Sequence, residues 1–589
     1  MTTLSTESPA SPPDRKTTLP APKYLRVFGV GRGGFLQYGV FIVLAIFVVA
    51  PIVPILYQSF RDRPLYAAGG IFTANNYLHL FTDAGFGQVI LNTAIFAVGT
   101  TALTLVIAIP MAVLVVRTRL PFGRILGLSM QWPFFVSSLI LGFGWITLYG
   151  PAGFISVQVR QLIGTVPWDL YSLGGMAVTE AVGLAPIAYV FCVNALRQSD
   201  PSLESAAQVC GAGPLRILFK VVVPMLRPPI VYSSILIFSM SLETLSVPLL
   251  YGTPVRIQVF STFLYTNGLQ SIRPDYGVLG AASTIILAAT IATVAIQAKV
   301  LKNAQRFISV RGKAVRPRLL NLGWIRWVAA IAIVIYVVFG ALLPILGLFF
   351  RSFTLIFTPL QNPLQTLTLA NYQRIFTFPV YVQSITNSLI VAAVGAVLVS
   401  ILALLAVLVA RRSTFRFARA VEYLALMPQA IPGIIVGIGF FWAFALLPGG
   451  LGGLFQGTLT AIIIAFGLRA LPTGFGSIAP AIMQIGRELD DAARTSGADW
   501  LGAFFRVLRS LLAPAFVGAL ILTFVTMLKE YSAALFLSSA NTGVIGTTML
   551  ELWVQGNTGS VAALATLQIA ITAVFVAVAS LFMRGRTDA

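Results

Sequence analysis

The chain has 589 residues, of which 57% are hydrophobic and only 10% are charged. A soluble globular protein has about a quarter charged residues, so this composition excludes a soluble globular enzyme. The net charge of +21 would suit a nucleic-acid-binding protein, but the basic residues lie between long apolar runs and therefore indicate a membrane surface and no nucleic acid. One histidine and two cysteines are too few for a Cys/His metal site or a disulfide framework.

The first 34 residues are rich in Ser, Thr and Pro and carry scattered basic residues. No small-residue cleavage site follows the first apolar run, which argues against a secretory signal. We therefore predict a cytoplasmic tail over residues 1–34 that precedes an anchored protein.

Twelve segments are long and apolar enough to span a membrane, six in each half of the chain. The criterion is about 20 mostly apolar residues for a hydrocarbon core of about 30 Å. The predicted spans are roughly 36–57, 89–115, 125–148, 174–196, 230–251, 277–300, 324–349, 388–410, 421–446, 459–478, 515–537 and 561–583. They define an all-α integral membrane protein with a first half over 35–303, a basic linker over 304–323 and a second half over 324–589.

The basic residues predict the orientation of these spans. If the amino terminus is cytoplasmic and every span crosses, cytoplasmic segments hold 30 of the 39 Lys and Arg residues and outer loops hold seven. Such an asymmetry follows the positive-inside rule. Both termini are therefore expected in the cytoplasm. The basic linker is expected either to lie close to anionic headgroups or to be an ordinary cytoplasmic loop that follows the positive-inside rule.

The two halves are versions of one unit. Five residues of the first half recur 295 positions later, namely Asn76, Tyr77, Asn92, Arg117 and Pro133 as Asn371, Tyr372, Asn387, Arg412 and Pro428. This repeat predicts two six-helix halves related by a pseudo-twofold axis.

A second shared pattern lies in the long cytoplasmic loop after the fourth span of each half, over 199–228 and 486–514. In both loops an acid is followed by two alanines, by a glycine seven residues after the acid, and by a proline seventeen residues after the glycine. The residues are Glu204, Ala206, Ala207, Gly211, Pro224 and Pro228 in the first loop, and Asp490, Ala492, Ala493, Gly497 and Pro514 in the second.

This pattern predicts a helix–turn–helix at the membrane surface. Asp200 and Pro201 suit a helix start, Glu204 lies near its positive end, and Gly211 ends the helix in a left-handed conformation. The second helix is expected to present one apolar face made of Leu215, Leu218, Val222 and Met225. In the second loop Gly486 is a poorer cap than Asp200.

The two loops resemble the coupling-helix motif, often called the EAA loop, of permease subunits in binding-protein-dependent ABC importers. The resemblance implies the type I importer permease fold and a place in the bacterial cytoplasmic (inner) membrane. It also implies two protein partners, a cytoplasmic ABC ATPase homodimer that receives the coupling helices and an extracytoplasmic substrate-binding protein. Two departures concern the second loop, where Asp490 replaces the usual glutamate and Ser510 takes the place that matches Pro224.

The chain is expected to be a transport subunit and not an enzyme. It contains no G-x-x-x-x-G-K-[ST] loop, because the pair Gly312-Lys313 is followed by Ala314. ATP and Mg²⁺ would then be bound by the partner ATPase, and no cofactor is expected in this chain.

The fused two-half arrangement resembles the ferric-iron group of these importers, and also the thiamine and aminophosphonate groups. Ferric iron is the substrate that we favour, while thiamine, a polyamine or an aminophosphonate remains open. Glu243 and Glu530 lie in the fifth span of each half, where two carboxylates would suit a passing hard cation. Alternatively these acids cap loops or pair with a neighbour such as Lys529. Glu180 in the fourth span and Arg469 in the tenth are further intramembrane charges, for which a packing ion pair and a role in transport are the two alternatives.

Two other classes of protein are less consistent with the sequence. A twelve-span secondary transporter also has 6+6 repeats, but its signature residues would follow the second span and not the fourth. An integral-membrane enzyme would need a catalytic cluster, which one histidine and no suitably spaced acids do not supply.

Overall fold

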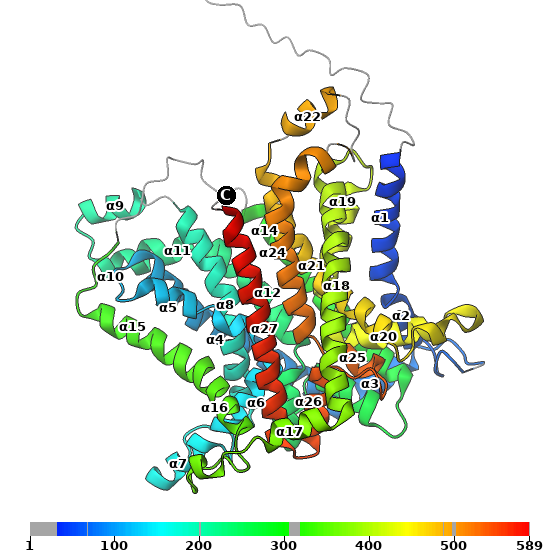
Figure 1. The fold of residues 1–589 in the computed structure, drawn as a ribbon, viewed down its shortest axis with the longest axis horizontal. Coiled ribbons are helices and arrows are strands. Elements are labelled where there is room, and N and C mark those ends of the chain that lie inside the picture. Colours follow the sequence, from blue (N-terminus) through cyan, green and yellow to red (C-terminus); the bar gives the residue numbers. More distant parts are fainter. Residues whose placement is uncertain are drawn as a thin grey trace, which may run out of the picture.

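The computed structural model describes residues 32–67, 69–199, 202–304, 319–486, 488–496, 502 and 504–587. Over these ranges the chain is almost entirely helical, and its only β-pairing consists of isolated bridges. The long helices run side by side as a bundle (Figure 1). The predicted all-α class is confirmed.

The described residues contain ten helical stretches that are long and apolar enough to cross a membrane. The number is twelve if each of two bent helix pairs is one span, namely Pro214–Met225 with Arg227–Glu243 and Ala418–Ala430 with Gly433–Ala445. The first half supplies α1 (Arg32–Val49) with α2 (Ile52–Ser59), α4 (Ala84–Arg117), α6 (Ser138–Tyr149) with α7 (Phe154–Ile163), α8 (Leu173–Gln198), α12 (Arg227–Glu243) and α14 (Tyr276–Ala304). The second half supplies α15 (Ile325–Ile335) with α16 (Leu343–Ser352), α18 (Pro379–Arg412), α19 (Ala418–Leu426) with α20 (Gly433–Ala445), α21 (Leu459–Gln484), α24 (Arg509–Lys529) and α27 (Thr558–Thr587). Six spans in each half agree with the prediction.

The third span of each half is not the continuous helix that we predicted over 125–148 and 421–446. The chain breaks at Pro133 in η2 (Trp132–Phe135) and at Pro428 in η10 (Met427–Ala430). Proline has no N–H to donate and disfavours helix in the residue before it, so the helix ends there. In the second half the two parts bend by 109°, and α20 runs across the long helices in Figure 1.

The fifth span of each half is also shorter than predicted. Helix α12 ends at Glu243 and α24 ends at Lys529, and short helical pieces follow at η4 (Pro248–Gly252) and α25 (Ala534–Leu537). Irregular backbone at membrane depth is tolerated only where it is buried in protein or lines a cavity. These two breaks therefore mark the interior of the protein.

The repeated residues play the same part in both halves. The side-chain amide of Asn76 donates to the carbonyl of Ser59 at 2.9 Å, and that of Asn371 donates to the carbonyl of Ser352 at 2.9 Å. Ser59 and Ser352 are the last residues of the first span of each half. Each asparagine thus fastens the following loop helix to the end of that span.

The first span of each half packs against the other half. Helices α1 and α2 contact α18, α19 and α20, while α15 and α16 contact α5 (Gly123–Ser129) and α6. A Cβ built on Gly439 would lie 2.2 Å from the carbonyl oxygen of Pro51, and one on Gly144 would lie 2.7 Å from that of Pro344. Gly144 and Gly439 are 295 residues apart, so one reciprocal contact interlocks the two halves.

We expect Gly144→Val and Gly439→Val each to destabilise the folded chain. The added side chain meets backbone and not a flexible side chain, so the cost should reach the upper part of the about 1–3 kcal/mol typical of overpacking. The measurement is the temperature at which the purified protein loses its monodisperse peak in size-exclusion chromatography. Gly39→Val is the matched control, because a Cβ there meets no atom within 4 Å. Equal midpoints for all three variants would contradict the interlocked arrangement.

Candidate functional site

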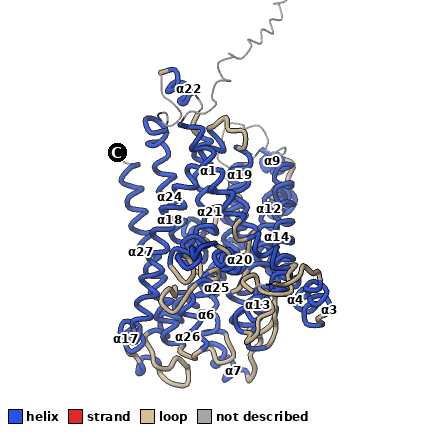
Figure 2. Tube along the Cα trace, turned by 90° about the vertical axis from the view of Figure 1, so that its right-hand side faces the viewer, coloured by secondary structure: helices blue, strands red, loops and turns tan. Residues whose placement is uncertain are grey.

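The first of the two shared loops, over 199–228, has the predicted helix–turn–helix form. Helix α9 (Ser202–Val209) carries Glu204, Ala206 and Ala207, and Gly211 follows it with φ +78°, which confirms the left-handed turn. A second helical segment begins with α10 (Pro214–Ile217). Figures 1 and 2 both place α9 and α22 (Glu488–Thr495) at the end of the bundle where the chain terminates.

The predicted apolar face of the second helix is partly wrong. Leu218 and Val222 are buried as expected, but Leu215 is 46% exposed and Ile217 is buried in its place. The cause is the π-helical turn η3 (Leu218–Val222), whose i to i+5 spacing places Ile217 and Val222 on the same side.

The second shared loop, over 486–514, is described only in part. Helix α22 carries Asp490, Ala492 and Ala493 in the order predicted. Gly497 lies outside the described residues, as do Asp200 and Pro201 of the first loop, so their predicted roles stay predictions. The prolines of the pattern lie in helices, since Pro224 is in α11 (Val223–Met225), Pro228 is in the first turn of α12 and Pro514 is inside α24.

A buried ion pair joins the first of the two shared loops to the membrane helices. The Nε atom of Arg117 lies 3.0 Å from Oε1 of Glu204, and both residues are nearly inaccessible, with 1% and 3% of their surface exposed. Arg117 also donates to the carbonyl of Leu196 at 2.9 Å. Burial raises the pKa of the Glu204 carboxyl above its ordinary value, and the Arg117 guanidinium opposes this shift. The loop is therefore joined to the ends of α4 and α8.

The second half repeats part of this arrangement. Arg412, at the end of α18, donates to the carbonyl of Ile482 at 2.7 Å and to that of Ile485. Ile482 lies in the last turn of α21, as Leu196 does in α8. The sequence identified Arg117 and Arg412 only as markers of the repeat, although two basic residues at equal places before a shared loop pointed to a shared contact.

We expect Glu204→Gln to loosen the first coupling loop, because Arg117 is left buried without its carboxylate. A free-energy change of about 1.4 kcal/mol alters an equilibrium constant tenfold, and the loss of one partner of a buried ion pair costs more than this. The loop should therefore open more often, and tryptic cleavage at the exposed Arg216 should accelerate at least about tenfold. Val209→Ala is the control, since Val209 is on the same helix and 89% exposed. Equal cleavage rates in the two variants would show that the ion pair does not hold the loop.

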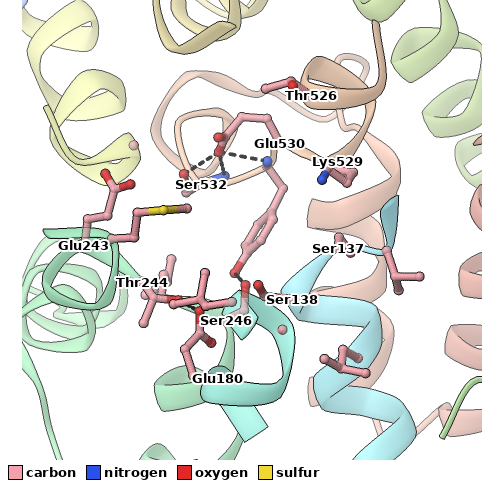
Figure 3. Close-up of a pocket in the computed structure, with 18 of the residues that line it drawn as sticks. Ser137, Ser138, Glu180, Glu243, Thr244, Ser246, Thr526, Lys529, Glu530 and Ser532 are labelled. Atoms are coloured by element: carbon pink, nitrogen blue, oxygen red, sulfur yellow. Dashed lines mark hydrogen bonds between the residues drawn. The ribbon is translucent and has the colours of Figure 1, made fainter. Parts of the chain in front are cut away.

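A polar cavity of about 230 Å³ lies where the two halves meet, next to the breaks in the fifth spans. The first half contributes Ser137, Ser138, Glu180, Glu243, Thr244 and Ser246, and the second contributes Arg469, Thr526, Lys529, Glu530 and Ser532. Figure 3 labels all of these residues except Arg469. Charged groups inside a membrane protein almost always face such an interior space. The structure thus brings together all the intramembrane charges that the sequence singled out.

Arg469 lies between the two acids that we predicted for the path. Its Nη1 and Nη2 atoms lie 2.7 and 3.3 Å from the carboxylate oxygens of Glu243, and its Nε lies 3.5 Å from Oε2 of Glu530. These side chains are only 13–20% exposed. The two carboxylates therefore share one guanidinium, a contact that sequence separations of 226 and 61 residues did not reveal.

Glu530 also caps the turn after α24. Its Oε1 accepts hydrogen bonds from the backbone N–H groups of Tyr531 at 3.1 Å and Ser532 at 2.9 Å. The alternative role of loop capping thus describes Glu530. Lys529, which we considered as its partner, donates to the carbonyl of Phe134 at 2.7 Å and lies over the Phe134 ring.

Glu243 and Glu530 are not equivalent in the repeat. Glu243 is the last residue of α12, and Lys529 is the last residue of α24. These two helix ends are 286 residues apart, which is also the separation of Glu204 and Asp490 in the two shared loops. At this separation, the residue of the first half that corresponds to Glu530 is Thr244. The two acids come from different structural positions that the fold brings to one cavity.

Glu180 is the third carboxylate of the cavity, and among the described residues it accepts the fewest hydrogen bonds of the three. It is 4% exposed, and its Oε1 accepts a hydrogen bond from the hydroxyl of Thr244 at 3.1 Å. Its Oε2 is buried without a hydrogen-bond partner among the described residues. Over the same ranges, no three His, Cys, Asp or Glu side chains gather as a ready metal cluster.

Two segments of the chain, residues 104–307 and 402–585, match the family described as "Binding-protein-dependent transport system inner membrane component". The chain is 26% identical to the putative ferric transport system permease protein FbpB 1 of Haemophilus influenzae over 86% of this chain and 78% of the relative. It is 24% identical to the ferric transport system permease protein FbpB of Actinobacillus pleuropneumoniae over 90% and 75% of the two chains. The putative 2-aminoethylphosphonate transport system permease protein PhnU of Salmonella choleraesuis is 27% identical over 37% of this chain and 76% of that protein.

Proposed function

Because the chain belongs to the family of binding-protein-dependent transport system inner membrane components and carries the family unit twice, we propose that it forms the complete substrate path of an ATP-driven ferric-iron importer. As a fused two-half permease of the type I ABC importer fold, it is a multi-pass inner membrane protein. Family membership also removes the reason to consider a secondary transporter.

The observation that supports the mechanism is the pair of loops at one end of the bundle. Helices α9 and α22 project there, and Arg117 and Arg412 join the ends of the membrane helices beside them. We propose that an ABC ATPase homodimer holding ATP and Mg²⁺ receives both loops. ATP-driven closure of that dimer would then move α9 and α22 as levers and rock the halves between inward and outward openings.

The distribution of basic residues supports the orientation of this assembly. Thirty of the 39 Lys and Arg residues would face the cytoplasm with the coupling loops and both termini. The opposite end of the bundle, near α7 and α17 (Ala370–Thr377) in Figure 2, would then meet the extracytoplasmic substrate-binding protein.

Ferric iron is the substrate best supported by the cavity and by the relatives. Oxygen ligands suit hard cations, and the cavity contains three carboxylates and several hydroxyls. Two relatives that match most of the chain are named as ferric transport permeases. Thiamine, a polyamine and an aminophosphonate are the competing substrates.

Cys210 offers a direct test of the coupling assignment. It is exposed beside Gly211, whereas Cys192 is buried, so a membrane-impermeant maleimide should label Cys210 alone. In inside-out vesicles we expect rapid labelling that stops when the ATPase subunit docks, and in right-side-out vesicles we expect none. Labelling that the bound ATPase leaves unchanged would contradict docking at this loop.

A matched pair of glycine variants sharpens this test. Gly211→Val forces a branched side chain into φ +78°, whereas Gly213→Val occupies ordinary backbone with φ −68°, and a Cβ meets no atom within 4 Å at either position. The left-handed conformation costs about 1–2 kcal/mol for a residue with a Cβ. Gly211→Val should therefore lower ATPase affinity and transport, while Gly213→Val should behave as wild type.

The substrate is tested with the reconstituted complex of permease, ATPase and binding protein. We expect ATP hydrolysis to rise when the binding protein carries Fe³⁺, because the loaded protein favours the transport-competent arrangement of the halves. Apo binding protein is the control. Stimulation by thiamine, a polyamine or an aminophosphonate, with none by Fe³⁺, would reassign the substrate and leave the importer assignment intact.

A further inference from the structure

The contact between Arg469 and Glu243 crosses from one half to the other, and the contact between Arg469 and Glu530 does not. Glu243 ends α12 in the first half, whereas Arg469 lies in α21 and Glu530 follows α24 in the second. Any motion that separates the halves must therefore break the first ion pair and can preserve the second.

The hydrogen-bond partners of Glu530 and Glu243 also indicate that Glu243 is the acid released when the halves separate. Glu530 holds two backbone N–H groups and the hydroxyl of Ser532 within its own half, so it moves as one unit with Arg469. Among the described residues, the carboxylate of Glu243 is hydrogen-bonded to Arg469 alone. A second bond between the halves joins Ser246 to the hydroxyl of Tyr531 at 2.9 Å. Separation would free Glu243 and Ser246 together.

Glu243 would be freed in a cavity that a second carboxylate of its own half also lines. Thr244, the next residue, donates to Glu180 at 3.1 Å, and Glu180 and Glu243 line the same cavity (Figure 3). Glu180 already has one buried carboxylate oxygen without a hydrogen-bond partner among the described residues. Two carboxylates that line one cavity together with hydroxyl groups offer the oxygen ligands that a hard cation prefers.

We propose that Glu180 and Glu243 form the cation-binding site of the transport path, and that the guanidinium of Arg469 occupies Glu243 until the halves separate. This proposal rests on the proposed importer function and replaces the symmetric pair of Glu243 and Glu530 by two acids of one half. Arg469 is a positioning residue, since it acts by covering and releasing Glu243.

Electrostatics favours such an exchange. A carboxylate left alone in a cavity of low dielectric constant is costly, so Glu243 remains with Arg469 while the cavity is empty. When a cation takes the place of the departing guanidinium, the acid is never left without a positive partner. The cargo itself then stabilises the separated arrangement.

The first experiment measures whether the ion pair keeps the halves together. In a Cys210→Ala background, Thr526→Cys places one reactive thiol in the cavity, and its labelling rate by a cationic methanethiosulfonate reports access. We expect Glu243→Gln and Arg469→Gln to raise this rate at least about tenfold in the permease without nucleotide. Glu530→Gln should change it less than about twofold, because the contact between the halves remains.

Controls separate this effect from a general loss of structure. Glu422→Gln removes an ion pair with Arg411 that lies wholly within the second half, and it should leave the labelling rate unchanged. The exchange of Glu243→Arg with Arg469→Glu should restore slow labelling. An unchanged rate in Glu243→Gln, or an equal rise in Glu530→Gln, would overturn the role of Arg469.

The second experiment measures uptake of radioactive Fe³⁺ into proteoliposomes that contain the complete complex. Glu180→Gln should lower the initial rate at least about tenfold while labelling of the thiol introduced by Thr526→Cys stays slow, and Glu243→Gln should lower uptake and speed labelling. Normal uptake in Glu180→Gln would overturn the cation site. Failure of the proposed function is distinct, since it would appear as unprotected Cys210 or as transport of another substrate by the wild-type complex.

Discussion

The absence of water from the bilayer core is the constraint on which the rest of the structure depends. Every charge and every interrupted backbone segment must find its partner inside the protein. In this chain the breaks after Glu243 and Lys529 and the charges of Glu180, Arg469 and Glu530 all meet in one cavity between the halves. The cost of burying them elsewhere makes this cavity the polar centre of the bundle.

The interlocked first spans would let the halves move, as we propose, without coming apart. Gly144 and Gly439 allow the backbone of the other half to approach closely, so each half carries one helix that is packed on its partner. Polar contacts in the cavity, by contrast, are few and reversible. Tight contact at the periphery and exchangeable ion pairs at the centre are what a rocking motion needs.

The two loops over 199–228 and 486–514 are also held by few polar contacts, at the end of the bundle where α9 and α22 lie. The coupling role that we propose for them requires attachment to the helices that they would move. Arg117 provides this connection in the first half through Glu204 and the carbonyl of Leu196, and Arg412 reaches the corresponding carbonyl of Ile482 in the second. The leading acid of the first loop is thus part of its attachment to the bundle.

The sequence by itself determined the helical class, the twelve spans, the doubled unit and the turn at Gly211. Hydropathy over about 20 residues, a fixed offset and the conformational freedom of glycine are local properties that need no knowledge of the fold. It also identified the prolines at 133 and 428 without revealing that they break the third spans. The tertiary structure alone decided that Arg469 meets Glu243 across 226 residues and that Glu204 is buried against Arg117. These pairings depend on which helix faces lie together in three dimensions, and the packing of whole helices sets that arrangement.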